Sequence, residues 1–362
     1  MKITQVQIEH VLAGEETQVL VVLHADNGVS GVGEAASTRI PSALSAALET
    51  AGQYLLGQDP LDSNGIFMRL AKIGSSGLGE MLPAVLNGIE AACLDLAGKQ
   101  LGVPACQLFG GAVRHEIRVC ATGWLAGEES TKELARKAKE IANVGFTVLE
   151  INPCPPESRY MRFPDRERAV KVIHRIREAV GDGIDLIVDA KGRFTAPEAI
   201  AFAEEVLPFR LLYLQDPVPG GDLNALEAVR HASPIPIAVS DFGSSLTNLR
   251  EVIERQLADF VHLDCVRLGG ISRARQFALL SEAWFMDVTL HHSGGPVTWA
   301  ANAQIAAAAP NFLLADLPYP VADSWGKMMN TSFELKNGCL NLASGGGLGV
   351  ESSALRNIPQ SV

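Results

Sequence analysis

The sequence predicts an α/β fold in which a parallel barrel of eight strands is joined to a second, α+β domain. Three observations favour this class. The chain has 362 residues, which exceeds the roughly 250 residues of one parallel barrel. Over residues 116–330, short apolar runs alternate with helical segments, as expected for parallel strands that are buried on both faces. Residues 1–115 instead show strand-like alternation followed by helical periodicity.

The predicted N-terminal domain, residues 1–115, begins with antiparallel strands. Asp26-Asn27-Gly28 is a turn signal between two alternating segments. Three strands are expected, at residues 3–8, 17–25 and 29–34. Helical periodicity follows and is clearest over residues 82–101, where small residues on one face permit close packing. An α+β domain accounts for both patterns.

The predicted barrel occupies residues 116–330. Its strands are expected at residues 116–122, 146–152, 186–188, 211–214, 237–240, 260–263, 288–290 and 312–316, with helices between them. This regular alternation favours a closed (β/α) barrel over an open, doubly wound sheet. Residues 331–362 contain strand-like segments and a glycine-rich run, and we expect them to return to the N-terminal domain.

Five consecutive barrel strands each end in a polar residue, and the carboxyl ends of parallel barrel strands meet at one rim. In chain order these residues are Asp189, Gln215, Asp241, Asp264 and His291. The first three offer oxygen ligands, which Mg²⁺ prefers. A cation held there would polarise a substrate carboxylate and stabilise the enediolate that forms when the adjacent C–H bond is deprotonated. The strand ends therefore predict a magnesium site that faces a small-molecule carboxylate.

The last two strand-end residues predict a catalytic pair. A histidine that follows an apolar strand is often a hydrogen-bonded rim residue, so His291 alone is weak evidence. Asp264 ends the preceding strand and can orient the imidazole ring and raise its basicity. Beside the predicted metal site, this pairing favours His291 as a general base. His292 has the opposite strand phase, so we expect it to point away from the site.

The net charge, the apolar runs and the cysteine pattern restrict which binding partners and which cellular compartment we expect. The formal net charge of −11 disfavours nucleic acid or an anionic membrane as a partner, whereas a local cation can still attract an anionic substrate. Residues 1–10 alternate like a strand, unlike a signal peptide, and no apolar run reaches the about 18 residues of a membrane span. The six cysteines form no C-x-x-C pair, so we expect reduced thiols in a cytoplasmic protein. A homo-oligomer is expected, as for most soluble enzymes.

Several motifs follow one another along the chain. They are GVGEA at 31–35, NGIEAACLDLAGK at 87–99 followed by GVPACQLFGG, VDAKGRF at 188–194, Asp-Pro at 216–217, AVSDFGS at 238–244, LDCVRLGGIS at 263–272 and GGGLGVE at 345–351. In this order and spacing they resemble the mandelate racemase/muconate lactonizing enzyme group of the enolase superfamily, over nearly the whole chain. The resemblance implies a modified TIM barrel of the (β/α)7β type with a capping domain, Mg²⁺ as cofactor, and proton abstraction next to a carboxylate. The D-x-x-x-x-G-G spacing from Asp264 resembles the mandelate racemase branch, in which an Asp–His dyad acts.

Two departures from the family pattern affect the proton-transfer residues. The second barrel strand of the family usually carries K-x-K, whose second lysine is an acid/base catalyst. Glu150 and Asn152 occupy these positions here, both on the inward face. Asn152 cannot exchange a proton near neutral pH and is left with a substrate-binding role. Glu150 is a candidate catalytic residue or, alternatively, a buried ion-pair partner.

Two further departures affect the cation site. Gln215 stands where the family usually has a ligating Glu, and its amide oxygen can coordinate Mg²⁺ but brings no charge, so the affinity should fall. Lys191 stands where Asn is common and shares the inward phase of Asp189. It can bind the substrate carboxylate, act as a base, or neutralise Asp189 and Asp241 in place of a metal. The alternative is a solvent-facing loop lysine.

The leading functional hypothesis is a lyase that abstracts a proton next to a carboxylate and dehydrates an acid sugar. Racemisation or epimerisation requires acid/base groups on both faces of the substrate carbon, and Asn152 in place of lysine makes that harder. Glu150 or Lys191 can restore a second base, so a racemase or epimerase remains an alternative. The other alternative is a catalytically altered barrel that binds a carboxylate without turnover, because Asn152, Gln215 and Lys191 change together.

Overall fold

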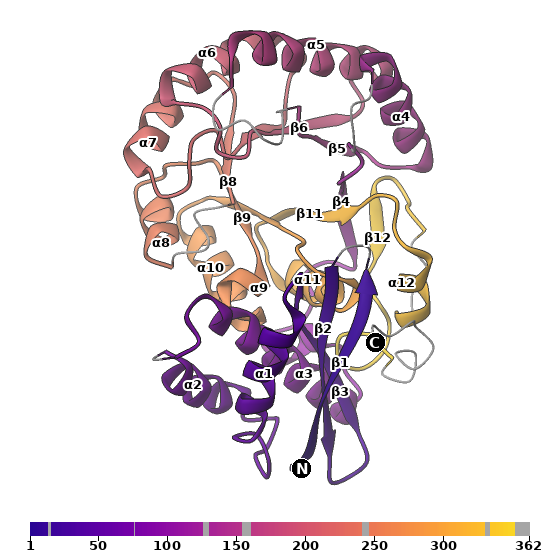
Figure 1. Ribbon diagram of the computed structural model, residues 1–362. Helices are drawn as coiled ribbons and strands as arrows, with labels where there is room; N and C mark the ends of the chain where they lie inside the picture. The colour runs from indigo at the N-terminus through magenta and orange to yellow at the C-terminus, as the bar shows by residue number, and fades with distance from the viewer. Residues whose placement is uncertain are drawn as a thin grey trace.

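The structure is a computed structural model that describes residues 1–13, 16–75, 77–125, 130–153, 161–240, 246–329 and 334–351. These residues form a barrel ringed by helices and, beside it, a three-stranded sheet with its own helices (Figure 1). The sheet and its helices come from the N-terminal part of the chain, and the barrel follows. This arrangement confirms the predicted α/β barrel with an α+β capping domain.

The N-terminal sheet is antiparallel in the order β1-β2-β3. Its strands are β1 (Ile3–Ala13), β2 (Glu16–Ala25) and β3 (Ser30–Thr38). Between β2 and β3, the backbone N–H of Ala25 donates to the carbonyl of Val29 at 2.9 Å and closes the expected turn. The helices of this domain are α1 (Pro41–Gly52), α2 (Ser63–Gly74) and α3 (Leu82–Leu101).

Strand β3 lies very close to helix α3, the central helix of the N-terminal domain. A Cβ atom on Gly33 would lie 2.0 Å from the carbonyl oxygen of Gly88, and one on Gly88 would lie 2.9 Å from Cα of Ala35, so both glycines are needed for this approach. The segment Gly79–Leu101 is long and apolar enough to cross a membrane, but 78% of its most apolar window is buried inside the protein. It is therefore a core helix of the capping domain.

Eight parallel strands close into a barrel. They are β4 (Glu116–Thr122), β5 (Val148–Ile151), β6 (Asp185–Asp189), β7 (Tyr213–Gln215), β8 (Ile237–Val239), β9 (Phe260–Leu263), β10 (Asp287–Leu290) and β11 (Phe312–Pro318). Each strand pairs with the next along the chain, and β11 pairs in parallel with β4, which closes the ring. The predicted (β/α)7β topology is thereby confirmed.

Helices follow the strands and cover the outside of the barrel. They are α4 (Thr131–Val144), α5 (Phe163–Val180), α6 (Ala196–Val206), α7 (Leu223–Ala232), α8 (Leu246–Glu254), α9 (Cys265–Leu268), α10 (Ile271–Ala283) and α11 (Pro296–Ala308). Short 3-10 turns span Gly79–Met81, Ala105–Phe109 and Leu207–Phe209. Helices α4 to α8 form the arc that faces away from the capping domain, whereas α9, α10 and α11 lie on the side that packs against α3 and β3 (Figure 1).

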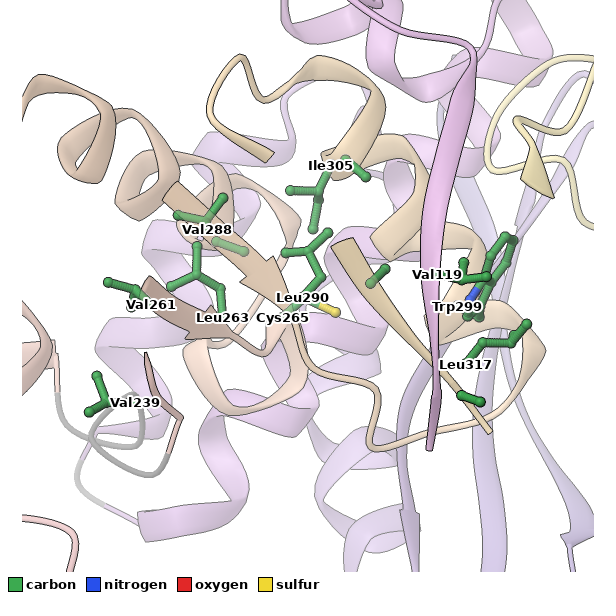
Figure 2. Close-up of a cluster of buried hydrophobic side chains, with 14 of the residues drawn as sticks. Val119, Val239, Val261, Leu263, Cys265, Val288, Leu290, Trp299, Ile305 and Leu317 are labelled. Atoms are coloured by element: carbon green, nitrogen blue, oxygen red, sulfur yellow. The ribbon is translucent and has the colours of Figure 1, made fainter. Parts of the chain in front are cut away.

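Alternation along the strands separates two apolar layers. The barrel interior contains Cys120, Val148, Ile187, Tyr213, Ala238 and Leu314. Neighbouring strand residues point outward into the larger core beneath the helices, where Val261, Leu263 and Leu290 lie with Ile305 of α11 (Figure 2). Because alternate strand residues share a face, the interior layer also fixes which strand-end side chains point inward.

The last described segment contacts both domains. Strand β12 (Cys339–Asn341) pairs antiparallel with β4, after the short helix α12 (Asp323–Met328). Further on, the backbone N–H of Leu348 donates to Asp95 of α3 at 2.8 Å, and that of Gly347 donates to the carbonyl of Val103 at 2.9 Å. The domain boundaries expected after residues 115 and 330 stay predictions.

Candidate active site

A cavity of about 250 Å³ lies at the carboxyl-terminal rim of the barrel. It is lined by Thr122, Gly123, Leu125, Glu150, Asn152, Lys191, His291, His292 and Asp316. The strand phase explains the inward direction, because Val148 on β5 and Ile187 on β6 lie in the barrel interior and side chains two residues further share their face. The structure therefore gathers four of the predicted site residues in one cavity: Glu150, Asn152, Lys191 and His291.

Asp264 and His291 form the predicted dyad. The Nδ1 atom of His291 lies 2.9 Å from Oδ2 of Asp264, and the Ser293 hydroxyl donates to the same oxygen at 2.7 Å. The backbone N–H of Val266 donates to Oδ1 at 2.8 Å. Burial alone would raise the pKa of Asp264, but its hydrogen bond to His291 and the imidazole charge outweigh burial and hold the pKa at about 2. Asp264 is therefore a carboxylate, and it leaves Nε2 of His291 as the ring nitrogen available to a substrate.

The loop that carries His291 is anchored on both sides. The backbone N–H of His291 donates to the carbonyl of Leu263 at 2.8 Å, and its own carbonyl accepts from the Asn302 side chain at 2.8 Å. Beyond it, Glu34 of the capping domain accepts from the backbone N–H groups of Gly295 at 2.6 Å and Thr298 at 3.0 Å. Glu34 is buried and its carboxylate caps the start of α11. The capping domain thus helps to position His291.

Replacing Glu34 by Gln is expected to lower kcat by about tenfold with little change in KM, because a small displacement of a positioned base is costly. The amide has one acceptor oxygen in place of two, so one of the two backbone N–H groups loses its partner. Steady-state kinetics would measure both constants. Glu49→Gln, an exposed change on α1, is the matched control. A lower melting temperature with unchanged kcat would reduce Glu34 to a purely structural residue.

Asp189 is fully buried at the end of β6, and both of its carboxylate oxygens contact Lys191. The backbone N–H of Lys191 donates to Oδ1 at 2.9 Å, and its ammonium group forms an ion pair with Oδ2. Burial alone would lower the pKa of Lys191, but the charges of Asp189 and Glu150 outweigh burial and hold the pKa above its ordinary value. Lys191 is therefore an ammonium cation at neutral pH, which argues against its use as a base.

Gln215 is buried at the end of β7, and its side-chain oxygen is bonded inside the protein. This oxygen lies 3.0 Å from Nδ1 of His262, whose Nε2 lies 3.2 Å from Oδ2 of Asp316. Burial alone would lower the pKa of His262, but the charge of Asp316 outweighs burial and raises it to about 9. The imidazole therefore carries protons on both nitrogens at neutral pH, donates to Gln215 through Nδ1 and forms an ion pair with Asp316 through Nε2.

Asp216, the neighbour of Gln215, does not face the cavity. Its buried carboxylate accepts from the backbone N–H of Ser240 at 2.7 Å and from the Ser240 hydroxyl. These bonds tie the end of β7 to the end of β8, as expected from the opposite strand phase of Asp216. Asp241, the third predicted magnesium ligand, follows Ser240 and lies outside the described residues.

The two described members of the predicted magnesium set do not fit a metal site as they stand. Asp189 uses both oxygens for Lys191, and the only oxygen of Gln215 accepts from His262. Among the residues that the structure describes, no cluster of three or more His, Cys, Asp or Glu side chains is arranged to hold an ion. The ligand set that includes Asp241 stays a prediction.

Glu150 lines the cavity as an acid with a raised pKa. Burial is the largest cause, and the charges of Asp316 and Asp189 add to it, while Lys191 and His262 oppose it. The pKa of Glu150 is about 8, so the carboxyl group is mostly protonated at neutral pH. It is therefore placed to donate a proton to a ligand in the cavity.

The expectation that His292 points away from the site is wrong. Strand β10 ends at Leu290, so strand phase no longer governs His292. The His292 ring lines the cavity and packs edge-on against Trp325, with ring centroids 5.2 Å apart. Burial and the nearby His291 lower its pKa to about 4, which keeps the ring neutral. Its two nitrogens are buried and have no hydrogen-bond partner within the described ranges.

Sequence reasoning missed the His262–Asp316 pair and Glu34. His262 has the same strand phase as Asp264, and Asp316 has the same phase as the interior residue Leu314. Strand alternation could therefore have predicted that both side chains point into the barrel. The role of Glu34 had no comparable signal, because its contacts to Gly295 and Thr298 join two domains across more than half of the chain.

Two family models match the chain. Residues 2–110 match "Mandelate racemase / muconate lactonizing enzyme, N-terminal domain", and residues 133–355 match "Enolase C-terminal domain-like". The chain is 29% identical to D-xylonate dehydratase of Haloferax volcanii over 96% of this chain and 86% of that protein. It is 28% identical to D-gluconate dehydratase of Thermoproteus tenax, over 92% and 67% of the two chains. A solved mandelate racemase/muconate lactonizing enzyme-like protein from Rubrobacter xylanophilus has a TM-score of 0.89 at 26% identity, covering 99% of this chain and 98% of that one.

Proposed function

Since the chain belongs to the mandelate racemase/muconate lactonizing enzyme family of the enolase superfamily, we propose that it removes water from an acid sugar. The observation that carries the proposal is the His291–Asp264 dyad at a cavity that Lys191 also lines. The dyad provides a base, and the ammonium group provides a positive charge for a carboxylate. The curated relatives named above are dehydratases of acid sugars, which agrees with this chemistry.

In the first step, Nε2 of His291 takes the proton from the carbon next to the substrate carboxylate. The electrons of the broken C–H bond move onto the carboxylate and form an enediolate. Asp264 holds the ring through Nδ1 and stabilises the imidazolium that results. Lys191 and Asn152 line the same cavity and are proposed to bind the substrate.

In the second step, the electrons of the enediolate form a C=C bond and the C–O bond of the neighbouring hydroxyl breaks. The departing oxygen takes a proton from Glu150 and leaves as water, and the enol product tautomerises to a 2-keto acid. His291 releases its proton and Glu150 regains one, so the residues return to their starting states. The raised pKa of Glu150 suits this donor role, because the group is protonated before the reaction begins.

Dehydratases of the enolase superfamily generally use Mg²⁺. The residues expected to hold it here are Asp189, Gln215 and Asp241. Because Asp189 and Gln215 do not fit a metal as they stand, the proposed steps use only side chains of the protein. Dehydration is favoured over racemisation because Asn152 cannot serve as a second base on the opposite face of the substrate carbon.

The proposal is tested by incubating the purified protein with a panel of acid sugars, including D-xylonate and D-gluconate, in D₂O. Formation of a 2-keto acid is the expected result. Deuterium exchange without loss of water would instead indicate a racemase or epimerase. A higher melting temperature with some acid sugars, but no exchange and no product with any of them, would indicate a barrel that binds carboxylates without turnover.

Replacing Glu150 by Gln is expected to lower kcat by about 10²-fold, because the amide cannot protonate the leaving hydroxyl. In the wild type, kcat should fall as the pH rises through about 8, since the pKa of Glu150 is about 8 and the acid form is the active one. This fall should be absent in the variant. A pH–rate profile of both proteins measures the effect, with the exposed change Glu204→Gln on α6 as control. If kcat of the Glu150 variant falls at high pH as in the wild type, the fall belongs to a group other than Glu150.

We also propose a cytoplasmic enzyme that acts on a small-molecule carboxylate without a nucleic-acid or membrane partner. The formal charge of −11 supports this, because it disfavours binding to nucleic acid or to an anionic membrane. The five cysteines within the described ranges are all unpaired thiols, in agreement with a reducing compartment. The homo-oligomeric state stays a prediction, and size-exclusion chromatography with light scattering would measure it.

A further inference from the structure

Lys191 is held in place by the backbone on both sides. Its φ is 53°, in the left-handed region that side chains rarely adopt. The backbone N–H of Ala190 donates to the carbonyl of Gln215 at 2.9 Å, and that of Gly192 donates to the carbonyl of Asp216 at 2.7 Å. The end of β7 thus fixes the residue on each side of Lys191. A strained residue that its surroundings hold in one conformation is typical of a functional site.

The ammonium group lies where a cation would be expected beside Asp189. A fully buried carboxylate needs a compensating positive charge, and Lys191 supplies it at Oδ2 while its backbone N–H bonds Oδ1. A divalent ion at this carboxylate would have to displace the ammonium group or lie next to it. Two positive charges in contact inside a pocket repel strongly. The position of Lys191 therefore disfavours a metal ion at Asp189.

Gln215 is a poor metal ligand for a different reason. Its single side-chain oxygen points to His262, and the other nitrogen of that ring contacts the buried Asp316. A metal bound through this oxygen would share it with His262, whose hydrogen bond already draws on the electrons of the amide oxygen. The amide also brings no negative charge with which to attract the ion.

We propose that the ammonium group of Lys191 takes the place of a divalent metal ion in this site and binds the substrate carboxylate directly, so that the reaction needs no Mg²⁺. The identification of the ligand as a carboxylate rests on the proposed function. An ammonium group has three N–H donors, of which one faces Asp189 and the others are left for the cavity that Lys191 lines. Its charge stabilises the enediolate as negative charge moves onto the carboxylate oxygens.

The first experiment measures Mg²⁺ binding to the full chain without substrate. Wild-type protein is expected to show no binding heat in calorimetry and the same melting temperature in EDTA and in about 10 mM MgCl₂. The double variant Lys191→Asn/Gln215→Glu removes the ammonium group and adds a carboxylate. It is expected to bind Mg²⁺ saturably and to melt at a higher temperature with the ion present. Lys139→Asn, which removes an exposed lysine of α4, is the matched control and should behave as wild type.

Saturable binding of Mg²⁺ to the wild type with a dissociation constant below about 1 mM would overturn the proposal, because the site would then hold the ion that Lys191 is proposed to replace. Such binding would also raise the melting temperature of the wild type by mass action. The wild-type measurement does not depend on the folding of any variant. A folded double variant that still binds no Mg²⁺ would also count against the proposal, since Lys191 and Gln215 would then not be what excludes the ion.

The second experiment uses D-xylonate and D-gluconate, the acids named for two relatives. Turnover by the wild type is expected to be unchanged by EDTA. Lys191→Met keeps the aliphatic stem and removes the charge, and it should raise KM by about tenfold or more. Turnover that EDTA abolishes and Mg²⁺ restores would overturn the metal-free site and leave dehydration intact. Failure of the whole acid-sugar panel would instead overturn the proposed function, and Mg²⁺ binding alone would then decide this inference.

Discussion

Replacing His291 by Asn is expected to abolish proton abstraction while the protein stays folded. The Asn side chain keeps an N–H group that can bond to Asp264, but it has no basic nitrogen to face the cavity. A general base contributes about 10²- to 10⁴-fold to a rate, so turnover should fall by that amount or more. The rate of deuterium uptake from D₂O and the rate of 2-keto acid formation measure the loss.

The matched control for this change is His174→Asn on the outer helix α5. His174 is half exposed on α5 and lies 3.4 Å from Glu178, so its replacement should leave both rates unchanged. Circular dichroism and the melting temperature establish that both variants are folded. Proton exchange that survives in the His291 variant would assign the base to a group other than His291.

Replacing Asp316 by Asn is expected to lower the free energy of unfolding by about 3 kcal/mol. Asp316 is the carboxylate partner of the buried His262, and the two side chains approach to 3.2 Å. Removing the charge of one partner leaves the other without compensation in the barrel interior. Urea unfolding at about pH 6 measures the difference. Glu254→Gln, which breaks a surface ion pair with Arg250 on α8, is the control and should have little effect.

The same pair predicts how stability depends on pH. The pKa of His262 rises from its ordinary 6.5 to about 9 in the folded protein, so its contribution is complete below pH 6.5 and is lost as the pH rises through about 9. Burial opposes ionisation of Asp316, but His262 keeps its pKa below the ordinary 3.8, so its contribution is complete above 3.8 and is lost at lower pH. The Asp316→Asn variant should lose most of the decline between pH 6.5 and 9. An equal decline in both proteins would contradict this assignment.

The fold and the dyad were predictable because both depend on local pattern. Apolar runs alternating with helical segments predicted the eight strands, and a closed parallel barrel brings their carboxyl ends together. Strand phase then decides which side chains point inward. For this reason Glu150, Asn152, Lys191 and His291 were expected in one place and share one cavity. His292 was misplaced because the strand ends before it.

The family, the barrel and the pairing of Asp264 with His291 follow from the order of residues along the chain, because motif spacing and strand alternation are local patterns. The bonding partners of the Asp189 and Gln215 side chains emerge only in the folded protein. One carboxylate is taken by Lys191, and one amide oxygen is taken by His262. Those contacts depend on a left-handed turn at Lys191 and on Asp316 of β11, which lies two strands from His262 of β9. Hydrogen-bond partners in a closed barrel are set by packing across strands, which no spacing along one strand records.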